Sequence, residues 1–504
     1  MLPTIFHAAV SSCKYFFVKV EPTSTSQNGI KIMKFKGLII GAVVAAAALV
    51  VAPWWIGQQV ETKVTRYVQL FSEGQPTYHA ELLSYERSWF GANATISLSM
   101  DPALFAAVDD MESDFSMTME LSIQHGPVLT DQGLELGLNS WQLLATGNDL
   151  REQLSWDSER PLYLQQGRVN LLGDAVFIDY IPELQWQSLE SEAFLTLSAY
   201  RGAGTYQNEV LEYAGDFDRF MAVIEENEIV MDQMALVLNA HASMETLLQG
   251  QLYENTARFT VAAIEVSDPD ELLFALNGLQ VTSELMFRDD LMDGVVNYEL
   301  AEMFAAGERI SDMQLKVALR NLDRQVIQRY IEQFNKLYQQ DPEIVEEEFE
   351  LLLEQEALAL LQAEPEFVIE RFNAVFPAGR VHGDALVGIY GVTSLPATTD
   401  DPDFWFAHLR GDMFTEIDKS LMDWVLERYV EYSLLAMQPG YSEQAEEQQQ
   451  TAIAQVKAQM LQGLLQSGFL REVEQTYQSS VSFANGELTV NGQVMPLEQW
   501  LGAM

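Results

Sequence analysis

The sequence predicts an α+β protein with an N-terminal transmembrane helix, a long antiparallel β-rich region and a helix-rich C-terminal part closed by a β-hairpin meander. Three observations predict this fold class: an uncharged apolar run near the N-terminus, stretches of alternating apolar and polar residues, and helical spacing in the last third. We expect four segments: a leader from a mis-assigned translation start at 1–32, an anchor with a basic flank at 33–58, an antiparallel β-rich region at 59–322 and a helix-rich α+β region at 323–504.

The anchor is predicted by the apolar run from Leu38 to Ile56. At about 1.5 Å per residue this run spans the ~30 Å hydrocarbon core of a bilayer. Lysines flank it on the N-terminal side, and Trp54 and Trp55 lie at its other end, where indole rings favour the membrane interface. The basic flank predicts a single-pass protein whose N-terminus is cytoplasmic and whose residues after about Ile56 lie on the far side.

A cleaved signal peptide is the alternative interpretation, because 50–52 (Val-Val-Ala) is a tolerable cleavage site. Pro53 follows directly and should hinder cleavage, and the run is longer than the usual ~7–15 residues, so we expect an uncleaved anchor. Residues 1–32 carry the sole cysteine, Cys13, and no apolar period. We therefore expect translation to start at Met33, where basic residues precede the apolar run.

The anchor helix is expected to continue to about Ser72 and to be followed by strands. In 115–123, five apolar residues alternate strictly with four polar ones, which is typical of a strand with one buried and one solvated face. Short helices are expected at Asp216–Glu226 and near Asp268–Phe274. Turn signals are expected at Gly202-Ala203-Gly204, Asn277-Gly278 and Asp293-Gly294. Further strand candidates are Ala94–Met100, Leu134–Leu144, Leu162–Leu171, Ala175–Ile181, Ala193–Tyr200, Gln207–Tyr213, Met234–Ala242, Arg258–Val266, Asn277–Phe287 and Gly294–Leu300.

Helical spacing returns from about Asp323, and Pro342 opens a second helix. A strand pair is expected around Gly379–Val392 and Phe404–Ile417, followed by an α-hairpin within Ile417–Leu465. In the tail, the pairs Asn485-Gly486 and Asn491-Gly492 predict two type I′ hairpin turns, because both residue types accept positive φ angles. These turns make a three-stranded meander, which a short helix around Pro496–Leu501 should close.

The composition excludes several classes of protein. The chain has 74 Asp and Glu against 28 Lys and Arg, a formal net charge of −46, with 48% apolar residues. Wholesale disorder is excluded by the many apolar and aromatic residues. Nucleic acid is excluded as a partner, because phosphates are neutralised by clustered Lys and Arg. The acidic excess indicates solubility in a salty medium or a cationic partner, and we favour solubility.

Two passages carry a family resemblance: 85–91 (Tyr-Glu-Arg-Ser-Trp-Phe-Gly) after the anchor, and 486–492 (Gly-Glu-Leu-Thr-Val-Asn-Gly) near the end. Together with the basic-flanked anchor they resemble the bacterial YdgA-like family, a domain of unknown function in Gram-negative bacteria. Ser88 stands where that family more often has glycine. The resemblance implies an inner-membrane-anchored protein with a large periplasmic domain, and it offers no catalytic residues.

No catalytic, cofactor-binding or metal-binding residue is assigned from the sequence. The chain lacks a Gly-x-Ser-x-Gly elbow and a phosphate-binding glycine loop. No two of its six histidines lie within five residues of each other, which weakens a metal site. The acidic loop Asp400–Asp403 could suit calcium, but chance clusters are expected among so many acids. The loop Arg288–Gly294 superficially resembles an EF-hand loop and fails the pattern, because Leu291 occupies the third ligand position.

One weak candidate interaction site follows the anchor, at Arg87, Trp89 and Phe90. A cation beside two aromatic rings just outside the membrane would suit a lipid headgroup or a partner helix. The alternative, which we favour, is structural: the arginine at a strand end pairs with an acid while the rings enter a core.

The function that we expect is non-enzymatic. An anchored periplasmic protein of this build would serve cell-envelope maintenance by binding an apolar, lipid-like ligand or a protein on its β-sheet. The first alternative is an assembly or scaffold factor for a membrane complex or homo-oligomer, with an exposed apolar patch on Ile417–Leu465. The second is a carboxylate-dependent hydrolase of envelope polymers, with two close carboxylates of which one has a raised pKa. The expected partners are the inner-membrane bilayer, a lipid or envelope protein and a second copy; no cofactor is expected.

Overall fold

The computed structural model describes residues 27–75, 77–100, 116–131, 133–151, 154–188, 193–337, 342–396, 398, 401–437 and 445–495. Within these ranges the side chains of residues 27–49, 100, 149, 335–337, 342–347, 349–350, 353, 436–437 and 495 are not described.

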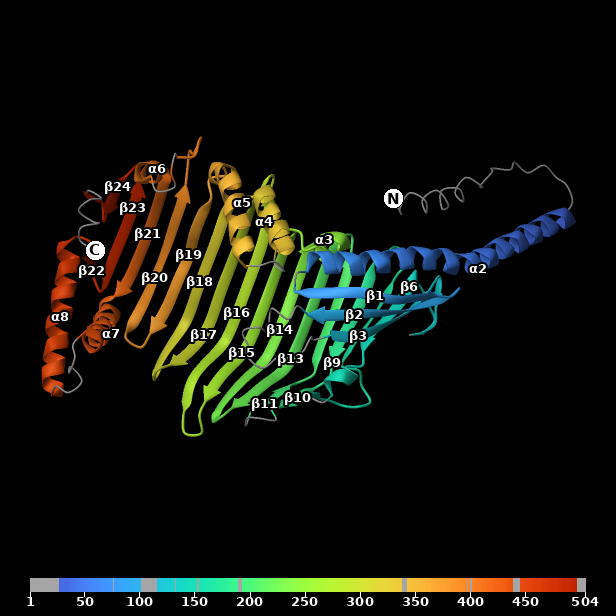
Figure 1. Ribbon diagram of the computed structural model, residues 1–504, viewed down its shortest axis with the longest axis horizontal. Coiled ribbons are helices and arrows are strands. Elements are labelled where there is room, and N and C mark those ends of the chain that lie inside the picture. Colours follow the sequence, from blue (N-terminus) through green and yellow to red (C-terminus); the bar gives the residue numbers. More distant parts are fainter. Residues whose placement is uncertain are drawn as a thin grey trace.

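A single 23-stranded sheet runs along most of the molecule (Figure 1). All its pairings are antiparallel, and one continuous path of neighbours leads from β1 through β2, β3, β6, β8, β9 and β12 to β21 and then β23, β24 and β25. The strands that precede the long central ones are β1 (Tyr78–Arg87), β2 (Gly91–Met100), β3 (Ser116–His125), β6 (Asn139–Ala145), β7 (Leu154–Ser155), β8 (Tyr163–Val169), β9 (Ala175–Ile181), β10 (Leu184–Gln187) and β11 (Phe194–Leu197). A separate small sheet pairs β4 (Val128–Leu129) with β5 (Glu135–Leu136).

The middle of the sheet is built from strands of up to seventeen residues, and its last part from shorter ones. The middle strands are β12 (Tyr200–Gln207), β13 (Val210–Ile224), β14 (Asn227–His241), β15 (Glu254–Ser267), β16 (Leu272–Arg288), β17 (Leu291–Ala305) and β18 (Glu308–Asp323). The last are β19 (Glu366–Phe376), β20 (Gly379–Ile389), β21 (Leu409–Asp418), β22 (Arg471–Val473), β23 (Thr476–Ala484), β24 (Glu487–Val490) and β25 (Gln493–Met495).

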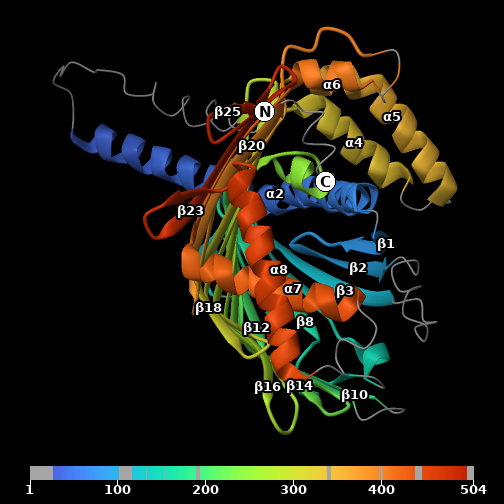
Figure 2. The ribbon, with the colours of Figure 1, turned by 90° about the vertical axis from the view of Figure 1, so that its left-hand side faces the viewer.

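The helices lie mostly on one side of this sheet, as the view of Figure 2 shows for α4, α5, α7 and the C-terminal half of α2. They are α2 (Gln27–Gly74), α3 (Met244–Leu248), α4 (Arg324–Leu337), α5 (Pro342–Gln362), α6 (Pro402–His408), α7 (Lys419–Met437) and α8 (Glu446–Gln466), with a 3-10 turn η2 (Asn148–Leu150). The curved sheet therefore has one face that helices border and an opposite face on which the described helices do not pack.

The predicted α+β class is confirmed in its coarse form, as a β-rich chain with one large antiparallel sheet. The α-hairpin is present as α7 and α8, and Pro342 opens α5 as expected. Both Asn-Gly turns are confirmed, with φ angles of 53° and 76° at Asn485 and Gly486 and of 50° and 81° at Asn491 and Gly492. The helix expected at Pro496–Leu501 lies outside the described residues.

Several local predictions were wrong because pairing across the sheet outweighs local sequence signals. Asp216–Glu226 is not a helix: most of it lies in β13, between β12 and β14. Gly202-Ala203-Gly204 lies inside β12 rather than in a turn, and a Cβ on Gly202 would clash with Tyr213 and Asp179. The pairs Asn277-Gly278 and Asp293-Gly294 lie inside β16 and β17. β19, which our sequence analysis missed, joins the C-terminal strands to β18.

The long helix α2 contains the whole of Leu38–Ile56 and continues two residues beyond Ser72. Leu38 belongs to the part of α2 whose side chains are not described, whereas Ile56 is buried. Within the described residues, no helix is long and apolar enough to span a membrane. The C-terminal half of α2 packs on the first strands, with its side chains against a buried cluster of the sheet. This contact comprises Val60, Val64, Val68 and Phe71 of α2 and Ala80, Ala94, Ile96, Leu121 and Ile123 of the sheet.

His125 lies under α2 at the end of β3 and is only 1% exposed. Among the described residues neither of its ring nitrogens makes a hydrogen bond of good geometry, and a Cβ on Gly57 of α2 would lie 2.5 Å from its Cε1. Burial, together with the positive charge of Arg87, lowers the pKa of His125 below its usual 6.5. The contact between α2 and the sheet is therefore formed with a neutral imidazole.

We expect acid to weaken this contact. Because the folded-state pKa is lowered, stability from His125 is complete above about pH 6.5 and is lost as the pH falls below that value, where the unfolded chain binds the proton first. The His125→Phe variant should lose less stability than the wild type between about pH 7.5 and 5.5. Urea unfolding of the full-length chain, followed by tryptophan fluorescence, measures this. His241→Phe, at an exposed position, is the control; equal acid sensitivity of all three proteins would contradict the prediction.

Candidate functional site

A row of residues that pair directly across neighbouring strands crosses the sheet, with its side chains on the face that α2 covers. Ala94 pairs with Leu121, Leu121 with Leu143, Leu143 with Gln165, Gln165 with Asp179, and Asp179 with Gly202. Directly paired residues of antiparallel strands point to the same face. The row therefore continues from the buried cluster under α2 into the middle of the sheet.

In the middle of the sheet this row becomes apolar and accessible. Gly202 pairs with Gly215, and six apolar residues on six neighbouring strands follow. We call these six residues the central row: Leu236, Phe259, Val281, Tyr298, Leu315 and Phe372. Four of them are 38–44% exposed, namely Leu236, Phe259, Tyr298 and Phe372.

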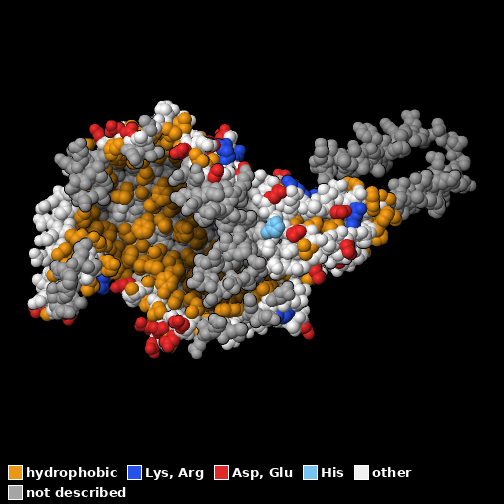
Figure 3. All heavy atoms as spheres, viewed as in Figure 1, with side chains coloured by type: hydrophobic (Ala, Val, Ile, Leu, Met, Phe, Trp, Pro, Cys, Tyr) orange, Lys and Arg blue, Asp and Glu red, His pale blue; other side chains and the backbone are white. Residues whose placement is uncertain are grey.

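A second apolar row lies on the same face, four residues further along β18. Leu319 pairs with Phe367, and Phe367 with Val387. These three side chains are 46%, 44% and 45% exposed. Figure 3 shows apolar side chains gathered in a hollow of this face, bordered by helices. We call it the apolar face; so many large accessible apolar groups side by side typically mark a binding surface.

The opposite face is polar. Residues one position along from the central row also form a continuous row, because successive side chains of a strand alternate between faces. That row comprises Arg201, Asp216, Ala235, Thr260, Gln280, Glu299, Gln314, Asn373, His382, Glu416 and Gln478. Several members are bonded to each other, for example Gln280 to Glu299 at 3.2 Å. The sheet is thus amphipathic along these two rows, although the exposed side chains of Ile178 and Val237 show that the opposite face is not polar throughout.

A polar cluster ends the central row toward α2. The Tyr213 hydroxyl donates to the Asp179 carboxylate at 3.0 Å and also contacts the Tyr200 hydroxyl. The rings fit because Gly202 and Gly215 lack side chains. Burial raises the pKa of Asp179, and the hydrogen bond from Tyr213 opposes this shift.

Beside this cluster, Trp141 donates its indole N–H to Gln165 at 3.3 Å. Gln165 in turn donates to the Tyr163 hydroxyl, also at 3.3 Å. Burial raises the pKa of Tyr163, of Tyr200 and of Tyr213. These hydroxyls therefore stay protonated at neutral pH and act as hydrogen-bond partners.

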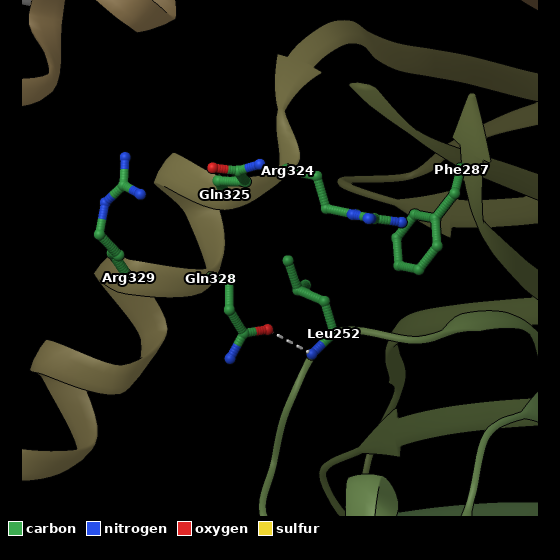
Figure 4. A pocket seen from close by; sticks show the side chains of 6 residues that line it. All are labelled: Leu252, Phe287, Arg324, Gln325, Gln328 and Arg329. Carbon is green, nitrogen blue, oxygen red and sulfur yellow. Dashed lines mark hydrogen bonds between the residues drawn. The ribbon is translucent and has the colours of Figure 1, made fainter. Parts of the chain in front are cut away.

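A cavity of about 390 Å³ lies where α4 meets the sheet. Its lining residues are Leu252, Phe287, Arg324, Gln325, Gln328 and Arg329, and Figure 4 shows the Arg324 side chain extending toward the Phe287 ring. The guanidinium carbon of Arg324 lies 4.9 Å from the centroid of that ring. Leu252 N–H donates to the Gln328 side chain at 2.9 Å and so ties the loop after α3 to α4.

The weak candidate site of Arg87, Trp89 and Phe90 lies at the turn between β1 and β2, against α2. Arg87 pairs with Glu61 of α2 at 3.4 Å, and Trp89 Nε1 donates to the Val50 carbonyl at 2.7 Å. Trp89 and Phe90 are 46% and 60% exposed. The arginine does pair with an acid, but the two rings remain accessible.

Trp54 and Trp55 are also accessible, at 41% and 40%, as are Val50 and Val51 of the same helix. This exposed aromatic group therefore joins residues of α2 to the β1–β2 turn, a proximity that sequence separation hid. Arg87 lies against α2 and not beside the central row. The polar cluster and the central row were not predicted from the sequence. For the central row, the sequence signal was the alternation of apolar and polar residues in β14–β18. That alternation does not indicate which face of the sheet remains accessible.

Enzyme-like arrangements are sparse in the part of the chain that the structure describes. No group of three or more His, Cys, Asp or Glu residues there is placed to hold a metal ion. Asp179 has the raised pKa that a catalytic acid needs, but burial causes the shift rather than a neighbouring carboxylate. Its hydrogen-bond partner is a tyrosine, which gives no paired-carboxylate geometry.

A family model supplies the one relationship found. A search of the curated proteins and a search of the solved structures each find no significant match. The model of DUF945, described as a bacterial protein of unknown function, matches residues 33–498, which is most of the chain. The chain therefore belongs to this bacterial family, DUF945.

Proposed function

We propose that this protein is a non-enzymatic, membrane-anchored envelope protein that binds an acyl lipid on the apolar face of its sheet. The observation that carries the proposal is the central row, six apolar side chains on six adjacent strands in direct register. Removing apolar surface from water contributes about 25 cal/mol per Å², so covering even ~200 Å² yields about 5 kcal/mol before the cost of association.

The geometry favours a chain-like ligand over a compact one. The central row runs across the strands, and neighbouring strands lie about 4.8 Å apart, so six strands give a nonpolar path of roughly 24 Å. The polar cluster around Asp179 stands at one end of this path, since Gly202 and Gly215 continue the same row. An elongated nonpolar chain matches this surface better than a small globular molecule does.

Membrane anchoring is the second part of the proposal, and it follows the YdgA-like resemblance. The apolar run Leu38–Ile56 belongs to one continuous helix that packs on the sheet through its second half. The accessible rings of Trp54, Trp55, Trp89 and Phe90 form the kind of aromatic group that favours a membrane interface. We place the N-terminus in the cytoplasm, the anchor in the inner membrane and the sheet in the periplasm.

Lipid binding predicts that lipid accompanies the purified protein. Native mass spectrometry of the full-length chain released from a mild detergent, followed by extraction and lipid analysis, should find about one lipid per chain or more. Phe259→Asp puts a carboxylate into the central row and should reduce the bound lipid at least severalfold, because a charge is not buried against acyl chains without a partner.

The matched control is Thr260→Asp, which adds the same charge one residue away on the polar face. This variant should keep the lipid content of the wild type. A lipid-free wild type, or equal loss in the two variants, would refute lipid binding on this face.

Anchoring predicts the topology of the chain in cells. A C-terminal epitope tag should be digested by protease added to spheroplasts, while an N-terminal tag stays protected, and both should sediment with the inner membrane. Ala46→Arg places a charge in the centre of the apolar run at a cost of about 2.5–3.5 kcal/mol and should release part of the chain. Thr65→Arg, further along the same helix, should not. A fully soluble wild type would contradict the anchor.

An assembly role is a second candidate, favoured by one observation on α7. Val425, Tyr429, Tyr432 and Leu435 follow helical spacing and are 39%, 58%, 73% and 52% exposed. This stripe falls within Ile417–Leu465, where an assembly factor was expected to carry an apolar patch. The same mass spectra separate the two candidates: lipid on a monomer favours the lipid-binding role, and a lipid-free dimer or larger species favours assembly.

A further inference from the structure

Three cations of the central strands lie on the polar face. Arg258, Lys316 and Arg371 directly neighbour Phe259, Leu315 and Phe372 of the central row, so their side chains leave the sheet on the other side. Lys316 is paired there with Glu370 at 2.5 Å. None of the six members of the central row is charged.

Two arginines reach the apolar side from α4 instead. Arg324 and Arg329 line the cavity that also contains Phe287, and Phe287 lies on the apolar face of β16. Phe287 and Val281 of the central row are six residues apart on one strand, which is about 20 Å, with Leu285 and the small Ser283 between them on the same face. The cavity therefore opens at the end of a nonpolar path that begins in the central row.

The Arg324 guanidinium is held in place but carries no ion pair among the described side chains. Its stacking on Phe287 orients it, and its backbone N–H donates to the Asp290 carbonyl at 2.9 Å. Two nearby carboxylates have other partners: Asp323 accepts two backbone N–H groups of α4 at 2.9 Å, and Glu254 accepts the Phe287 N–H at 3.1 Å.

Three other cations at the borders of the apolar face are paired with carboxylates. Arg329 pairs with Glu356 of α5 at 2.7 Å. At the α7 border, Lys419 pairs with Glu472, and Lys457 pairs with both Asp423 and Glu427 at 3.0 Å. A planar guanidinium that lacks a carboxylate and faces a cavity has the geometry to bind phosphate oxygens in a bidentate manner.

We propose that the bound lipid is anionic, with a phosphate headgroup in the α4 cavity against Arg324 and an acyl chain along the apolar face toward the central row. This inference rests on the lipid-binding function proposed above and specifies its ligand class. Charge complementarity selects the headgroup, and the nonpolar path along β16 accommodates the chain.

The test is a competition between two lipids of equal chain length. The full-length protein is incubated in mixed micelles that contain equal amounts of phosphatidylglycerol and phosphatidylcholine, re-isolated by gel filtration, and its bound lipids are quantified by mass spectrometry. The wild type should be enriched in phosphatidylglycerol, and Arg324→Gln should lower that enrichment by about tenfold, the effect of losing one charge-assisted contact.

Two further variants make the result specific. Arg324→Lys keeps the charge but loses the bidentate fork and the stacking on Phe287, so it should retain part of the preference, between the values of the wild type and of Arg324→Gln. A merely structural role of the arginine would not predict this order. Arg258→Gln removes one cation from the polar face and should leave the preference unchanged. If the wild type binds both lipids equally, or Arg324→Gln behaves like Arg258→Gln, the headgroup site is refuted while lipid binding stands. If the wild type binds neither lipid, both proposals are refuted together.

Discussion

The unbroken antiparallel register from β2 to β23 is the constraint on which the rest of the structure depends. The pairing of each strand determines which residues of the next strand point to each face of the sheet. A slip of one residue in the pairing would move every side chain to the opposite face. Across sixteen successive strands the phase holds from Ala94 under α2 to Ser479 of β23. The local irregularities, such as the extra residue in β19 near Glu370, leave this phase intact.

The nonpolar face of an amphipathic sheet of this size is stable in water only where helices or a ligand cover it. At the N-terminal end α2 covers it, and the helical side chains of Val60 and Phe71 belong to the same cluster as Ile96. At the other end α7 covers it, where Phe376 contacts Trp424 at a ring distance of 5.8 Å. Between these two covers the central row stays accessible, which is why we assign binding to it and not to the strands beneath the helices.

Some polar groups on the apolar face have partners that compensate for their burial. Asp179 is bonded to a tyrosine whose ring fits over glycine, and Gln165 joins Trp141 to Tyr163. Each buried polar group on this face that lacked such a partner would cost about 1–3 kcal/mol. His125 carries this cost, because neither ring nitrogen makes a hydrogen bond of good geometry among the described residues, and it stands where α2 rests on the sheet. The junction between α2 and the sheet is therefore sensitive to protonation.

The sequence by itself determined the local elements whose cause is local. The alternation in 115–123 predicted β3, Pro342 predicted the start of α5, and the two Asn-Gly pairs predicted the last meander, because φ preferences and periodicity act within a few residues. Pairing between distant strands decided the rest: it converted Asp216–Glu226 and the glycines of β12 into sheet, and it placed β19 beside β18. Alternation shows that a strand has a nonpolar face, but only the tertiary structure decides whether a helix covers that face. For this reason the candidate binding roles of the central row and of Arg324 were recognised from the tertiary structure and not from the sequence.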